Sequence, residues 1–126
     1  MKPPFVEKSV VVDVGSDVAW QALVEPDGLS EWFGATARVE RIEPGSHIEF
    51  SWEDGAVRGV TIEEVVPGRR LAFRWMPFVR TTRGPVRVPG SRVEIDLEEE
   101  RDGTRITVRE TGTDVPAVHE TIGVTR

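Results

Sequence analysis

The 126-residue sequence predicts an α+β fold in which a curved antiparallel sheet of about six to seven strands packs against two short helices. Three observations lead to this prediction. A helical apolar pattern follows the first strand-like run, several alternating apolar segments follow the helices, and short turns containing Gly and Pro separate those segments. Such turns join antiparallel neighbours, and the apolar face of the resulting sheet must be covered. Residues 1–126 fit a single domain.

The first strand is expected over residues 5–14. Val10 and Val12 alternate with polar residues and share one face, which Lys8 interrupts. Gly15 then provides a turn into helical sequence.

Residues 16–33 carry the clearest helical signal. Ser16 and Asp17 are favourable N-cap residues for a first helix, and Pro26 ends that helix because proline disfavours helical geometry in the residue before it. A second short helix follows. The pair is too short to bury its own apolar stripes and needs a sheet to lie against. The stripe residues are Trp20, Leu23, Val24, Leu29, Trp32 and Phe33.

Alternation of apolar and polar residues predicts the remaining strands. They are expected over residues 47–52, 56–66, 69–76, 91–98 and 104–110, with a less regular extended segment over 35–42. Residues 77–90 contain three prolines and two glycines and are predicted to form a long loop. After Gly112 a short or truncated C-terminal helix is expected, with Pro116 in its first turn.

Composition excludes several classes of function. A net charge of −6 argues against nucleic-acid binding. The absence of cysteine excludes disulfides and Cys-based zinc sites. No apolar run approaches the roughly 18 residues of a membrane span, so no membrane insertion is expected. We expect a cytoplasmic protein without a cofactor.

Positive charge is concentrated in one segment. Residues 65–93 contain seven arginines and no acidic residue, so this segment carries +7 and the remainder −13. One interpretation is a recognition surface for an anion or an acidic protein partner, through Arg80, Arg83 and Arg87. The other is a charged outer sheet face that keeps edge strands from pairing.

The ordered set of motifs resembles the START/Bet v 1-like (SRPBCC) superfamily and, within it, the group related to the activator of Hsp90 ATPase. The resemblance spans about residues 5–112. It is carried by residues 18–23, 65–71, 73–75, 93–97 and 104–108, together with Pro26, Leu29, Trp32, Phe33 and Gly59.

The resemblance implies a helix-grip fold, in which a curved sheet grips a long C-terminal helix around an apolar cavity. Members of the superfamily bind hydrophobic small molecules, act as cyclases or hydrolytic enzymes, or serve as co-chaperones. This chain has only residues 113–126 available for the helix. A short helix, a truncated helix, or a second copy of the chain in a homodimer would each account for the difference.

The first function that the sequence favours is binding of a small hydrophobic ligand, with Arg58 placed to orient a carboxylate or phosphate if the ligand is anionic. The alternative is that the aromatic residues only fill the core. The residues expected to line the cavity are Trp20, Trp32, Phe33, Phe50, Trp52, Arg58, Phe73, Trp75 and His119.

The sequence contains no convincing catalytic constellation, and catalytic residues are not identified. On an enzyme of the cyclase or hydrolase type, the acid–base candidates would be Arg58, Glu64 and His119. His47 and His119 have no Cys, Asp or Glu at recognised ligand spacing, so no metal site is expected. A co-chaperone-like interaction module is the remaining alternative.

Overall fold

The computed structural model of the protein describes residues 5–112. The predicted C-terminal helix and His119 lie outside the described residues. The elements in chain order are β1 (Phe5–Val12), α1 (Ser16–Val24), α2 (Pro26–Phe33), β2 (Thr36–Val39), β3 (His47–Ser51), β4 (Val57–Val66), β5 (Arg70–Trp75), β6 (Phe78–Thr81), β7 (Gly84–Arg87), β8 (Ser91–Glu100) and β9 (Gly103–Gly112).

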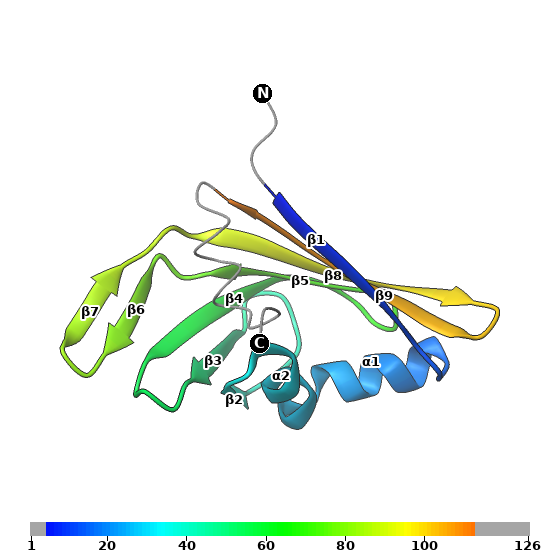
Figure 1. The fold of residues 1–126 in the computed structure, drawn as a ribbon, viewed down its shortest axis with the longest axis horizontal. Coiled ribbons are helices and arrows are strands. Elements are labelled where there is room, and N and C mark those ends of the chain that lie inside the picture. Colours follow the sequence, from blue (N-terminus) through cyan, green and yellow to red (C-terminus); the bar gives the residue numbers. More distant parts are fainter. Residues whose placement is uncertain (1–4, 113–126) are drawn as a thin grey trace.

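Seven of the strands form one antiparallel path in the order β1-β9-β8-β5-β4-β3-β2. The sheet curls, and both helices lie against one of its faces, as Figure 1 shows. This arrangement confirms the predicted α+β class and the curved antiparallel sheet. None of the helices described within residues 5–112 is long and apolar enough to cross a membrane.

The predicted helix pair is confirmed, but its N-cap is not the predicted one. Gly15 occupies the N-cap position without a side-chain hydrogen bond, and its carbonyl accepts from the Ala19 N–H at 3.0 Å. The prediction of Ser16 and Asp17 as caps was wrong because the helix begins one residue earlier. Pro26 starts α2, where its missing N–H is not needed.

Residues 77–90 are not a loop, contrary to the prediction. They contain the β6–β7 hairpin, which is attached to the main path through the pairing of Arg80 with Val57 of β4. The three prolines do not prevent the hairpin, because proline is tolerated in a strand at the sheet edge. Pro85 lies in β7, whose pairing partner within the described residues is β6.

Glu64, one of the acid–base candidates from the sequence, would have to face the interior of the fold but lies on the outer face of the sheet. The β4–β5 register shifts by one residue between Ile62 and Glu64, which is a β-bulge. The extra residue turns Glu64 to the outer face, where it lies 3.6 Å from Arg70 and 3.7 Å from Arg92.

The core occupies the concave face beneath the helices. Phe33 of α2 packs against three aromatic rings of the sheet, and its ring centroid lies 4.9 Å from that of Phe50, 5.8 Å from Phe73 and 5.9 Å from Trp75. All four side chains are buried. These contacts hold α2 at a fixed position over β3, β4 and β5.

The two helices approach each other closely at Gly28. A Cβ atom at this position would lie 1.6 Å from the carbonyl oxygen of Ala22, so no other residue fits there without movement of the backbone. Gly59 of β4 offers a contrast, because a Cβ there would meet its nearest neighbour, Met76 Cγ, at an ordinary 3.7 Å.

We therefore expect Gly28→Ala to destabilise the fold by about 3 kcal/mol, since the clash involves backbone atoms that must shift. Urea unfolding followed by tryptophan fluorescence measures this loss. Gly59→Ala is the matched control and should change the free energy of unfolding by less than about 0.5 kcal/mol. Equal stability of the two variants would contradict the described helix–helix contact.

Candidate functional site

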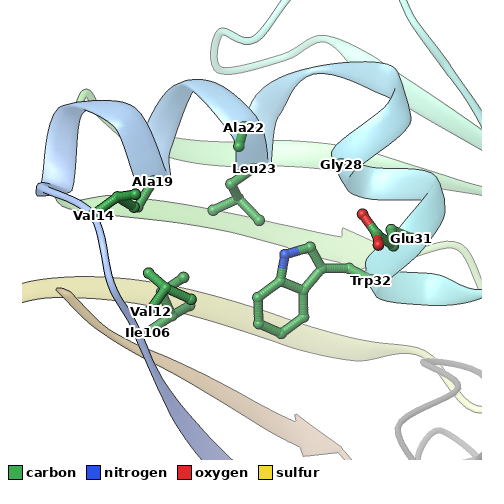
Figure 2. A pocket seen from close by; sticks show the side chains of 9 residues that line it. All are labelled: Val12, Val14, Ala19, Ala22, Leu23, Gly28, Glu31, Trp32 and Ile106. Atoms are coloured by element: carbon green, nitrogen blue, oxygen red, sulfur yellow. The ribbon is translucent and has the colours of Figure 1, made fainter. Parts of the chain in front are cut away.

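A pocket of about 380 Å³ lies between the helix pair and the β1–β9 side of the sheet. Figure 2 shows side chains from both helices and from the two strands around it. The lining residues are Val12, Val14, Ala19, Ala22, Leu23, Gly28, Glu31, Trp32 and Ile106. The lining is therefore apolar except for one carboxylate.

Small residues create this space. Ala19 and Ala22 of α1 and Gly28 of α2 border the pocket, and none of the three has a side chain long enough to fill it. Trp32 is half-buried and projects from α2 toward the sheet, as Figure 2 shows. The helix pair thus covers the sheet without filling the volume beside β1 and β9.

A second feature, the buried polar cluster, consists of Arg58, Trp75, Ser91 and Glu110. The Arg58 side chain is buried, and its Nε donates to the Met76 carbonyl at 3.0 Å while one terminal nitrogen donates to the Pro89 carbonyl at 2.9 Å. Its guanidinium carbon lies 5.0 Å from the centroid of the Trp75 ring. This distance permits a cation–π interaction.

Glu110 is fully buried, at 0% exposure, and its Oε2 accepts a hydrogen bond from Ser91 Oγ at 2.9 Å. Burial raises the pKa of Glu110 to about 7, although the Ser91 hydrogen bond, the Arg58 charge and the nearby Trp75 N–H act in the opposite direction. Desolvation lowers the pKa of Arg58 to about 10, against the effect of Glu110. Each of the two buried charges therefore reduces the pKa shift that desolvation causes in the other.

Two polar atoms of this cluster are not satisfied. Trp75 Nε1 and Glu110 Oε1 are buried and make no hydrogen bond of normal geometry within the described part of the chain. The indole N–H is close enough to influence the carboxyl pKa, but it does not form a well-aligned bond to it. A donor and an acceptor thus remain available on the inner face of the sheet.

Comparison with known proteins identifies the family. The model of the family described as activator of Hsp90 ATPase homolog 1-like protein matches residues 13–124. The chain belongs to this family. The resemblance inferred from the sequence is thereby confirmed.

Several solved structures share the fold of this chain at low sequence identity. MLL2253 from Mesorhizobium loti has a TM-score of 0.73 and 20% identity, over 95% of this chain and 84% of that protein. DynU16, from the dynemicin biosynthetic locus, has a TM-score of 0.72 and 22% identity, over 95% of this chain. CalU16 from Micromonospora echinospora has a TM-score of 0.61 and 24% identity, over 92% of this chain and 64% of that one. The chain spans only 41% of the length of DynU16.

The residues expected to line one cavity lie in different parts of the structure. Phe33, Phe50, Phe73 and Trp75 pack against one another in the core, and Trp20 is also buried. Trp32 is the aromatic residue that lines the pocket beside β1 and β9. Trp52 is half-buried and borders a different hollow, while Arg58 belongs to the buried polar cluster. Contact of these residues with a ligand stays a prediction.

Sequence reasoning missed every residue that lines the pocket except Trp32, and it missed three polar residues of the two sites, Glu31, Ser91 and Glu110. Glu110 and Ser91 continue the alternation of buried residues in β9 and β8, after Ile106 and Val108 and before Val93, and this pattern could have identified both. Glu31 gave no signal, because it lies on the exposed side of α2 and the pocket depends on how the two helices sit on the sheet.

The arginine-rich segment is divided between the sheet and the hairpin. On the outer face, Arg70 lies 2.6 Å from Asp96, and Arg74 and Arg92 lie 3.0 and 2.9 Å from Glu63. On the hairpin, Arg80 lies 3.5 Å from Glu49. Within residues 5–112, no group of three or more His, Cys, Asp or Glu side chains is placed to hold a metal ion.

The buried carboxyl predicts an unusual pH dependence of stability. Because the pKa of Glu110 rises from 4.5 to about 7 on folding, the folded protein retains between these pH values a proton that the unfolded chain has released. The retained proton adds to the free energy of unfolding, and this addition is fully present below pH 4.5 and is lost as the pH rises through 7. Its size is on the order of 3 kcal/mol.

Glu110→Gln should therefore unfold with a free energy that varies less between pH 5 and 8 than that of the wild type, and it should be the more stable of the two at pH 8. Urea titrations across this range provide the measurement. Glu98→Gln, at an exposed position of β8, is the control and should follow the wild type. Parallel pH profiles for the wild type and Glu110→Gln would show that Glu110 does not titrate in this range.

Proposed function

We propose that the protein binds a small hydrophobic molecule in the pocket between the helix pair and strands β1 and β9. The observation that carries this proposal is a hollow of about 380 Å³ whose lining, as far as the described residues form it, is apolar apart from Glu31. Ligand pockets in proteins are usually about 300–1,000 Å³ in volume and apolar, with a few placed polar groups. DynU16, a fold neighbour from a biosynthetic locus, is consistent with the handling of a small molecule.

The aromatic cluster in the core is a less suitable place for the ligand. Phe33, Phe50, Phe73 and Trp75 are at most 2% exposed and already contact one another. A ligand among them would have to separate these rings. Trp32, which is half-buried at the pocket, offers an indole face without such a rearrangement.

The sequence suggested Arg58 as the partner of an anionic group on the ligand. In the structure, the Arg58 guanidinium already has several partners. Arg58 already donates to two carbonyls and is balanced by the Glu110 carboxyl. The hydrophobic body of the ligand therefore supplies most of the binding free energy in this proposal.

An enzyme of the cyclase or hydrolase type is a second candidate, supported by Glu110. A buried carboxyl with a pKa of about 7 can exchange a proton at physiological pH, as a general acid or base must. Glu110 then replaces the outward-facing Glu64 as the acid–base candidate, with Ser91 and Arg58 beside it.

A co-chaperone-like interaction module is supported by the β6–β7 hairpin. Arg83 and Arg87 are exposed and make no ion pair with any residue of the described range 5–112. Phe78 and Val86 of the same hairpin are 44% and 50% exposed. An acidic protein partner could bind here through Arg80, Arg83 and Arg87.

Filling the pocket tests the main proposal. Ala22→Trp places an indole at an exposed position that borders the pocket, and it should weaken binding of the fluorescent probe N-phenyl-1-naphthylamine by at least about tenfold. Val18→Trp is the matched control, because Val18 is 54% exposed on the same helix and does not line the pocket. Equal affinities of the two variants would contradict the proposed location, provided that circular dichroism shows both to be folded.

A further inference from the structure

Among the described residues that line the pocket, the one charged residue is the acidic Glu31, and none is a Lys, Arg or His. Glu31 and Trp32 are consecutive residues of α2, and Figure 2 shows the side chains of both at the pocket. An incoming molecule therefore meets an apolar wall with one carboxylate at its edge.

The surroundings of α2 extend this negative field. A neighbouring hollow of about 470 Å³ shares Glu31 and adds Glu53 and Trp52, and none of the residues within 5–112 that line it is basic. Two carboxylates and two indoles thus lie around one short helix. Both hollows favour the same sign of charge in a ligand.

Glu31 of α2 makes no ion pair within residues 5–112, whereas most carboxylates of the sheet do. Glu49, Glu63 and Glu64 each lie within 4.0 Å of an arginine. Glu31 and Glu53 make no ion pair with any residue in the range 5–112. Their charges are available to a ligand, since no arginine of this range neutralises them.

Trp32 adds a second interaction for a cation. The face of an indole ring attracts a positively charged nitrogen placed within about 6 Å, with a strength of about 0.5–2 kcal/mol depending on desolvation. An exposed carboxylate adds a further contribution of the size of a surface ion pair. A carboxylate beside an indole at the edge of an apolar pocket therefore suits an organic ammonium group on a hydrophobic body.

We propose that this pocket selects hydrophobic molecules that carry a positively charged nitrogen, with Glu31 and Trp32 as the residues that recognise the charge. The inference rests on the proposed function, because it assigns a chemical class to the ligand of the same pocket. Repulsion by Glu31 and Glu53 disfavours a hydrophobic anion of the same shape, so the selection has an attractive and a repulsive part.

Three naphthalene probes of matched shape test the proposal on the intact protein: 1-naphthylmethylamine, 1-naphthalenemethanol and 1-naphthoate. They are positive, neutral and negative at pH 7, and calorimetry gives their affinities. We expect the amine to bind roughly tenfold more tightly than the naphthoate, with the alcohol between them. The difference should shrink in high salt, because the charges lie near the surface.

Two isosteric variants locate the source of the preference. Glu31→Gln should reduce the preference for the amine over the alcohol to the part that Trp32 supplies, while changing the affinity of the alcohol by less than about twofold. Glu53→Gln removes the same charge from the neighbouring hollow and should retain the preference for the amine.

Three results would overturn the proposal. These are naphthoate binding at least as tightly as the amine, a preference for the amine that Glu31→Gln does not reduce, and a preference for the amine that is lost in Glu53→Gln alone. In each case the probes still bind, and the hydrophobic pocket remains supported. If none of the three probes binds the wild type, or if Ala22→Trp leaves all three affinities unchanged, the proposed function itself fails.

Discussion

The contact of Phe33 with the aromatic residues of the sheet determines how the rest of the molecule is arranged. Because Phe33 packs on Phe50, Phe73 and Trp75, α2 lies over β3, β4 and β5 and carries α1 with it through the close approach at Gly28. The helix pair then covers the concave face with small residues on the side of β1 and β9. The pocket follows from this placement: the aromatic contact fills one part of the concave face and leaves another part lined by short side chains.

Charges are distributed so that most of them are balanced within the protein. The arginines of the outer face lie beside acidic residues of β4 and β8, and Arg58 inside the molecule is balanced by Glu110. Among the residues of the range 5–112 that make no ion pair are Glu31 and Glu53 around α2, and Arg83 and Arg87 on the β6–β7 hairpin. Ligand recognition is accordingly best sought where the charge is not already balanced.

The sequence predicts this architecture well because the fold depends on local patterns. Alternation in β3, β4, β5, β8 and β9 and the helix break at Pro26 are readable residue by residue. The β-bulge before Glu64 and the hairpin around Pro85 were missed, because each depends on pairing with a distant strand. The same reason explains the sites. Arg58 and Glu110 lie on predictable strand faces, whereas Glu31 borders a pocket only because tertiary packing places α2 beside β1 and β9.

The central claim is that a hydrophobic ligand occupies the space between the helix pair and strands β1 and β9. Intermolecular nuclear Overhauser effects between 1-naphthylmethylamine and ¹³C-labelled methyl groups test it most directly, because they report contacts within about 5 Å of the ligand. The account predicts effects to the methyl groups of Ala19, Leu23 and Ile106, which line the pocket. Effects confined to Val79 and Val86 of the β6–β7 hairpin would contradict it.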